Sequence, residues 1–130
     1  MSGTSLDGID VALIETDGEA LVRRGPSATY PYSPAQRDEL RRALDLAKSL
    51  EDRAARPHGL GLIEERLTRW HAEAVRAFRS AHMDAARRID VIGFHGQTVF
   101  HGPERRITVQ LGDGALLASP YGPPRLFPAE

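Results

Sequence analysis

Ile89-Asp90-Val91-Ile92-Gly93-Phe94-His95-Gly96 is the segment on which the predicted fold class depends most. It is short, apolar and rich in β-branched residues, and it ends at a glycine, so it predicts a buried β-strand. Two strand-like runs follow, at residues 98–100 and 107–111. The sequence Gly-Asp-Gly at 112–114 breaks the last of them, and a helix is expected to begin within residues 115–118.

Two amphipathic helices are predicted before this strand. The first begins at Ser33-Pro34-Ala35-Gln36, because a serine cap, a proline in the first turn and a glutamine reaching back to the cap are typical of a helix start. Its apolar positions recur at helical spacing. They are Leu40, Ala43, Leu44, Ala47 and Leu50.

The second helix is separated from the first by Arg-Pro-His-Gly at 56–59, which breaks a helix. Its apolar face consists of Ile63, Leu67, Trp70, Ala74 and Phe78. Its opposite face consists of Glu65, Arg69, Glu73 and Arg76. Such paired charges indicate an ordinary solvated face.

An antiparallel meander is predicted over residues 1–32. Ile9, Val11 and Leu13 alternate with Asp10, Ala12 and Ile14, which predicts a strand. Asp17-Gly18 is a hairpin turn signal. Further strands are expected at 20–22 and 28–30. Strands, then two helices, then more strands predict an α/β domain with helices packed on a mixed sheet.

The composition argues against several classes of protein. With 130 residues, 41% of them hydrophobic, the chain is long enough for one domain or part of one. Its 17 basic and 18 acidic residues give a net charge of -1, which removes the usual electrostatic reason to expect a nucleic-acid or membrane-surface partner. It has no cysteine, hence no disulfide and no thiolate site. No apolar run approaches the ~20 residues of a membrane span, and no signal peptide is visible, so a cytoplasmic protein is expected.

The strongest local motif is Ser2-Gly3-Thr4-Ser5-Leu6-Asp7-Gly8-Ile9-Asp10. Its glycines permit close backbone approach, its successive N–H groups can form an anion-binding nest, and Thr4 and Ser5 add hydroxyls. Asp7 and Asp10 can hold Mg²⁺ directly or through water. The motif is neither a Walker A loop nor a dinucleotide-binding turn, and a plain Gly/Ser/Asp turn before a strand is the alternative.

A second motif occupies residues 93–101, after the predicted strand, where open α/β sheets bind ligands. His95, Gln97 and Thr98 offer donors and acceptors suited to a sugar hydroxyl or an amide. His95 and His101 lack a nearby third ligand and a metal-binding spacing, which argues against a metal site. A hydrogen-bonded structural role is the alternative for each histidine, and it is favoured for His101.

A third motif lies at residues 109–114, where a helix N-terminus could face an anion. A capping role for Asp113 is favoured over anion binding. A hydrolase that uses Ser5, His95 and Asp113 is a further alternative, but the chain has no Gly-x-Ser-x-Gly nucleophile elbow. The other histidines, at positions 58, 71 and 82, are expected to be solvated on the surface.

Together the three motifs resemble the anhydro-N-acetylmuramic acid kinase family. The segments are Met-Ser-Gly-Thr-Ser-Leu-Asp-Gly-Ile-Asp at 1–10, Gly-Phe-His-Gly-Gln-Thr-Val-Phe-His-Gly-Pro at 93–103 and Thr-Val-Gln-Leu-Gly-Asp at 108–113. The resemblance covers about residues 1–118, roughly the first third of a family member. It implies part of the N-terminal lobe of an actin-like ATPase fold, shared with sugar kinases and Hsp70.

The resemblance also implies a reaction and its site. ATP would phosphorylate the 6-position of 1,6-anhydro-N-acetylmuramic acid while water opens the anhydro bridge, in cytoplasmic recycling of cell-wall sugar. His95, Gln97 and Thr98 match a segment placed on the sugar side, whereas Gly112 and Asp113 match a pair without an assigned role. The match to the ATP phosphate-binding loop, with Asp7 and Asp10 organising Mg²⁺, comprises Gly3, Thr4, Ser5, Leu6, Asp7, Gly8, Ile9 and Asp10.

The chain departs from the family pattern at both ends. A short apolar strand usually precedes Met-Ser-Gly-Thr-Ser, and Asp-Phe-Arg and Gly-Gly-Gln-Gly-Ala-Pro segments usually follow; none occurs here. The family's catalytic base, an aspartate, is expected beyond residue 130. Residues 119–130 contain four prolines, which cannot continue a helix or a central strand, and resemble an out-of-frame tail.

These departures predict a partial lobe over 1–118, a Pro-rich tail over 119–130, and no activity of the chain alone. Two alternatives stay open: a second chain supplies the missing lobe, or the chain is a non-catalytic phosphate- or nucleotide-binding module. Residues and spacing leave the oligomeric state open.

Overall fold

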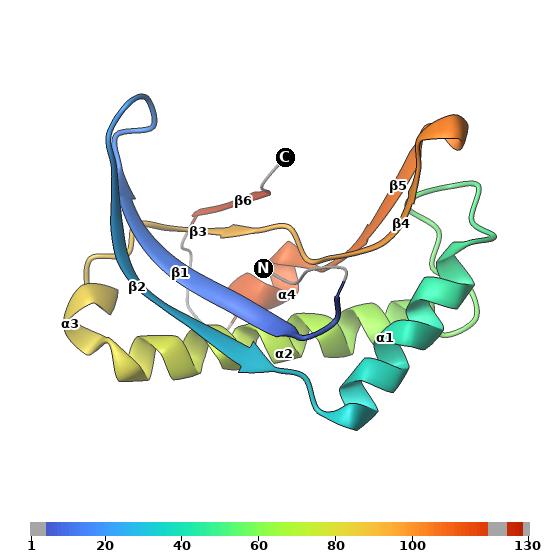
Figure 1. Ribbon diagram of the computed structural model, residues 1–130, viewed down its shortest axis with the longest axis horizontal. Helices are drawn as coiled ribbons and strands as arrows, with labels where there is room; N and C mark the ends of the chain where they lie inside the picture. Colours follow the sequence, from blue (N-terminus) through green and yellow to red (C-terminus); the bar gives the residue numbers. More distant parts are fainter. Residues whose placement is uncertain (1–4, 120–124, 129–130) are drawn as a thin grey trace.

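The structure is a computed structural model that describes residues 5–119 and 125–128 (Figure 1). It is a mixed α/β fold of small sheets and helices, in the predicted order of strands, helices and further strands. The elements are β1 (Gly8–Thr16), β2 (Val22–Pro31), α1 (Pro34–Ala47), α2 (Leu60–Ala81), α3 (Met83–Ala86), β3 (Val91–Phe94), β4 (Gln97–Gly102), a 3₁₀ turn (Pro103–Arg105), β5 (Ile107–Leu111), α4 (Gly114–Ala118) and β6 (Arg125–Pro128).

The N-terminal strands form one long antiparallel hairpin, β1–β2. Asp17 organises the turn, since its Oδ1 accepts hydrogen bonds from the backbone N–H groups of Glu19, Ala20 and Leu21. These bonds hold the pKa of Asp17 below its usual value. The strand predicted at 28–30 lies within β2, but residues 20–21 lie outside any strand. The division into two short strands is wrong, because β2 is one continuous strand that passes Pro26 at an irregularity in the β1–β2 register.

Both long helices form where the sequence predicts them. Ser33 Oγ accepts from Gln36 N at 3.2 Å and Gln36 Oε1 accepts from Ser33 N at 2.8 Å, which is a complete capping box at the start of α1. Gly59, with φ of 86°, ends the loop before α2. The predicted apolar faces are buried or half-buried, and the predicted charged face of α2 is exposed.

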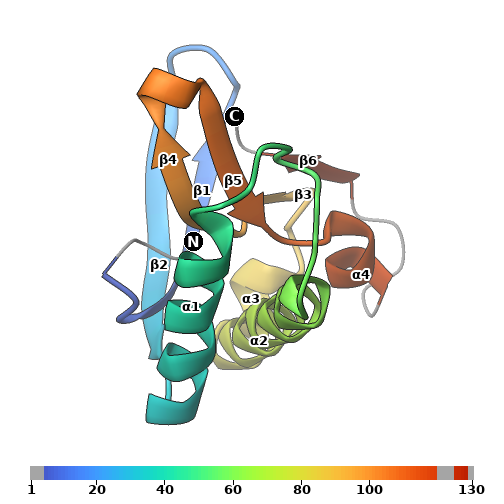
Figure 2. The ribbon, with the colours of Figure 1, turned by 90° about the vertical axis from the view of Figure 1, so that its right-hand side faces the viewer.

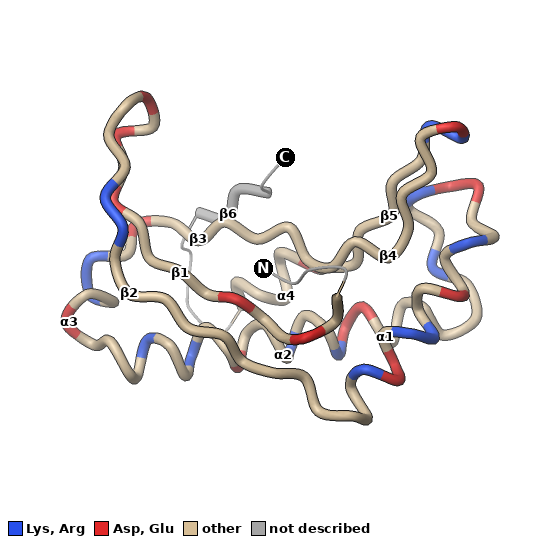
Figure 3. Tube along the Cα trace, viewed as in Figure 1, with Lys and Arg blue, Asp and Glu red and all other residues tan. Residues whose placement is uncertain are grey.

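The core lies between the two helices and the strands (Figures 1 and 2). Both helices lie on one side of the strands, and the hairpins β1–β2 and β4–β5 rise at the two ends of α2. Both α1 and α2 carry acidic and basic residues along their length (Figure 3), and several form exposed pairs within one helix turn. The largest fully buried core side chains include Leu40, Leu60, Leu67, Val109 and Leu111.

The strand β3 differs from its prediction. It covers only Val91–Phe94, and its residues alternate between exposed and half-buried, with Val91 46% exposed. The prediction of a buried strand is therefore wrong. Within the described residues β3 has one sheet neighbour, β6, which pairs with it in parallel, so no sheet surrounds it on both sides.

The Pro-rich segment contributes β6 at Arg125–Pro128, which pairs with β3 at the edge of a two-stranded sheet. An edge position is the one a proline tolerates, since it lacks an N–H to donate. The structure places Pro128 at the end of the ladder, opposite Phe94. None of the helices in the described part of the chain has the length and apolarity to cross a membrane.

Candidate functional site

The N-terminal motif is described from Ser5 onward; Gly3 and Thr4 lie outside the described residues. Leu6 has φ of 56° and is buried, whereas Ser5 and Asp7 are exposed. The backbone N–H of Tyr32 donates to the Asp7 carbonyl oxygen at 3.0 Å. The buried leucine therefore anchors a turn in which the neighbouring polar residues, Ser5 and Asp7, are exposed.

The remainder of this motif begins β1. A Cβ on Gly8 would lie 2.5 Å from the carbonyl oxygen of Tyr30, so only glycine permits this close strand pairing. Asp10 is exposed, and its Oδ1 accepts from the Thr29 hydroxyl across the hairpin at 2.5 Å. Gly8 therefore has a structural role, and Asp10 has a fixed orientation.

Asp7 and Asp10 both carry exposed carboxylates, a ligand type that Mg²⁺ takes. No group of three or more ligating side chains is arranged to hold a metal ion in residues 5–119. Magnesium usually keeps several waters and binds proteins through one or two carboxylates plus substrate phosphates, so two exposed carboxylates fit an ion carried by a nucleotide.

The second and third motifs meet in the β4–β5 hairpin. Gln97 pairs with Leu111 and Thr98 with Gln110, so the two segments lie side by side. Their backbones cross at Gly96, with φ of 71°, where a Cβ would lie 1.8 Å from the Leu111 carbonyl oxygen. This crossing requires glycine and fixes how the two motifs face each other.

Among the residues predicted to lie on the sugar side, the side chains differ in exposure. Gln97 is fully buried and donates to the Thr98 carbonyl oxygen at 3.1 Å. Thr98 and His95 are half-buried, and His95 Nδ1 is buried without a hydrogen-bond partner. His101 Nδ1 lies 2.8 Å from Thr108 Oγ1 on the neighbouring strand, which confirms the structural role favoured for His101.

Asp113 is the N-cap of α4, as its favoured interpretation predicts. Its Oδ1 accepts from Leu116 N at 3.0 Å, and its own N–H donates to Thr68 Oγ1 at 3.0 Å. This carboxylate is engaged in capping, which weakens the hydrolase alternative that needed Asp113 to orient His95.

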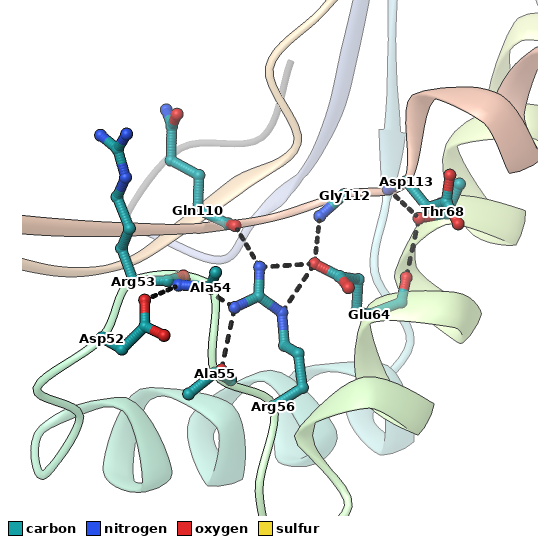
Figure 4. A network of polar contacts seen from close by, with 10 residues as sticks. All are labelled: Asp52, Arg53, Ala54, Ala55, Arg56, Glu64, Thr68, Gln110, Gly112 and Asp113. Atoms are coloured by element: carbon teal, nitrogen blue, oxygen red, sulfur yellow. Dashed lines mark hydrogen bonds and ion pairs between the residues drawn. The ribbon is translucent and has the colours of Figure 1, made fainter.

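A polar network connects the third motif to α2 (Figure 4). Arg56 pairs with Glu64 at 2.9 Å and donates to the Gln110 carbonyl oxygen at 3.1 Å. Glu64 Oε2 accepts from Gly112 N at 3.1 Å, and the Thr68 hydroxyl donates to the Glu64 carbonyl oxygen at 2.7 Å. Apolar periodicity did not indicate a role for Arg56, Glu64 or Thr68. The only signal was that Glu64 and Thr68 follow the apolar positions 63 and 67.

His71 is buried, so the expectation that it is solvated is wrong. Its side chain is 3% exposed, its Nδ1 lies 2.8 Å from the Leu67 carbonyl oxygen, and its ring makes an edge contact with Phe94 at 5.2 Å. Burial lowers the pKa of His71 to about 4. His71 lies on a side of α2 that the apolar positions alone do not mark, and Phe94 of β3 packs against its ring. His58 is exposed, as expected, and His82 is half-buried against Phe78.

Comparisons with known proteins place the chain among relatives of one kind. A family model described as anhydro-N-acetylmuramic acid kinase matches residues 1–123. The anhydro-N-acetylmuramic acid kinase of Agrobacterium fabrum is 53% identical over 122 residues, covering 94% of this chain and 33% of that protein. Those of Bradyrhizobium diazoefficiens and Brucella suis are 55% and 50% identical over 118 and 127 residues, with 32% and 34% of their lengths covered. The chain spans about a third of the length of these curated relatives.

Proposed function

The chain belongs to the anhydro-N-acetylmuramic acid kinase family, and from this we propose that it carries the phosphate-binding part of an ATP-dependent sugar kinase. The family match over residues 1–123, which includes all three motifs, carries the proposal. In the complete reaction the γ-phosphoryl group of ATP is transferred to O6 of 1,6-anhydro-N-acetylmuramic acid. Water adds at C1 as the C1–O6 bond breaks, giving ADP and N-acetylmuramic acid 6-phosphate.

The loop from Gly3 to Asp10 holds the phosphates in this proposal. The outward-facing Ser5 and Asp7 and the positive φ of Leu6 support it, because such a turn presents backbone N–H groups to an anion. Asp7 and Asp10 orient the Mg²⁺ that accompanies ATP. That ion, when bound, neutralises charge on the phosphate oxygens.

His95, Gln97 and Thr98 contribute to the sugar side. The unpartnered Nδ1 of His95 has capacity for one further hydrogen bond, and a sugar hydroxyl can provide it. Buried Gln97 orients the backbone at Thr98, which leaves the half-buried threonine hydroxyl beside Gln110. In this proposal the side chains of His95 and Thr98 bind a polar ligand, and the backbone that carries Thr98 is held in place by Gln97.

Residues 1–118 form part of an actin-like lobe in this proposal, and β6, from the Pro-rich segment 119–130, pairs with β3 of that unit. The setting is the bacterial cytoplasm, where cell-wall sugar is recycled. Kinases of this architecture assemble their site by closure of two lobes. The family's catalytic aspartate is expected outside the third of the relatives' length that this chain spans. The chain alone therefore binds phosphate but does not transfer it.

Titration of the ¹⁵N-labelled chain with MgATP, followed by NMR, tests the phosphate-binding role. We expect the largest changes in amide chemical shift at Ser5 to Asp10. Asp10→Asn keeps the acceptor for Thr29 but removes the charge, so affinity should fall about tenfold. Glu15→Gln, an exposed carboxylate further along β1, is the matched control and should leave binding unchanged. Absence of these shifts at millimolar MgATP, or equal weakening by both variants, would refute the proposal.

A further inference from the structure

One face of α2 carries three buried or half-buried polar residues at helical spacing: Glu64, Thr68 and His71. Spacings of four and three place them on one side of the helix. We call them the α2 polar face. Burying polar groups costs free energy unless each has a partner, so such a stripe calls for an explanation.

The α2 polar face makes hydrogen bonds and a ring contact to the second and third motif segments. Glu64 and Thr68 accept from the successive backbone N–H groups of Gly112 and Asp113. The His71 ring contacts Phe94, the residue before His95. The helix α2 thus binds the backbone of the third motif by hydrogen bonds and contacts the second motif through the Phe94 ring.

Two buried ring nitrogens without hydrogen-bond partners suggest that a ligand binds near this face. Because the Leu67 carbonyl accepts a hydrogen bond, His71 Nδ1 carries its proton and Nε2 is an acceptor. That Nε2 is buried without a partner, as is Nδ1 of His95. Unpartnered polar atoms at buried positions are expected where a ligand or a water supplies the missing hydrogen bond.

We propose that Glu64, Thr68 and His71, with Arg56 bracing Glu64, are positioning residues that hold the segments 94–98 and 110–113 in the arrangement that receives the sugar. The identity of the ligand as a sugar rests on the proposed function. The positioning of the two segments is independent of it. Arg56 contributes through its ion pair with Glu64 and its bond to the Gln110 carbonyl oxygen. None of these residues needs to touch the reacting atoms.

Thr68→Val tests the positioning, because it removes the hydroxyl and nearly preserves the volume. In the full 130-residue chain we expect amide hydrogen exchange at Asp113 to accelerate about tenfold, with altered imidazole ¹⁵N shifts at His95. Thr68→Ser should restore both. The matched control is Thr108→Val, which removes an exposed hydrogen-bonded hydroxyl at the other end of β5 and should change neither.

Glu64→Gln provides a second variant if Thr68→Val fails to fold. It keeps an acceptor for Gly112 N but loses the charge that pairs with Arg56, so exchange at Gly112 should accelerate. Folded variants with unchanged exchange at Asp113 and Gly112 and unchanged His95 shifts would overturn the proposal.

Titration with 1,6-anhydro-N-acetylmuramic acid separates positioning from function. We expect sugar-induced shifts at residues 95–98 that weaken in Thr68→Val, while MgATP-induced shifts at residues 5–10 persist. If the exchange effects occur but the wild-type chain shows no sugar-induced shift, the positioning stands and the sugar-side assignment fails. If the sugar binds equally well to both proteins, the role of the α2 polar face in receiving it is wrong.

Discussion

His71 couples the fold to pH, because its ring is buried in the neutral form beside Leu67 and Phe94. Burial lowers its pKa to about 4 from the ordinary value of 6.5. The unfolded chain therefore binds a proton over this interval that the folded chain does not. Stability should be highest above pH 6.5, and about 3 kcal/mol of it should disappear as the pH falls to about 4.

Urea unfolding of the wild type and of His71→Gln between pH 4 and 7.5 measures this effect. The variant should show a flatter dependence of the unfolding free energy on pH, whatever its stability at pH 7. His58→Gln, an exposed histidine, is the control and should retain the wild-type slope. A slope that survives in His71→Gln would assign the titration to another group.

At the scale of elements, the crossing of the β3–β4 connection over the end of β5 holds the candidate site together. We expect Gly96→Ala to destabilise the chain by about 3 kcal/mol or more, because its Cβ would lie 1.8 Å from the Leu111 carbonyl oxygen, which must move. Gly93→Ala, nearby in β3, meets no atom within 4 Å and should be tolerated. Thermal unfolding of the two variants checks this; equal melting temperatures would show that the crossing is not tight.

The elements also show which signals the sequence contains. Ser33 and Gln36 specify the start of α1 by contacts three residues apart, so a local pattern predicts it. His71 packs against the ring of Phe94, which lies on β3, and β3 itself pairs with residues 125–128, far from it in the chain. Such long-range partners leave no periodic signal. The three motifs were recognisable from residue type, but the role of Glu64 and Thr68 was not, because hydrophobic periodicity takes no account of polar residues on a buried face.

For the molecule as a whole, the match to the Agrobacterium fabrum relative includes 94% of this chain but only 33% of that protein. The proposed phosphate loop, the sugar-side segment and the α2 polar face all lie within that shared third. In the function proposed above, this third supplies groups that bind phosphate and sugar, and phosphate transfer requires closure of two lobes.

The most direct test joins residues 1–118 of this chain to the remaining two thirds of the Agrobacterium fabrum kinase and follows phosphate transfer by ³¹P NMR. With MgATP and 1,6-anhydro-N-acetylmuramic acid, the joined protein should form the 6-phosphate, Asp10→Ala in it should abolish the product, and the chain alone should form none. A folded joined protein that makes no product while the native relative does, or one in which Asp10→Ala leaves turnover unchanged, would contradict the account.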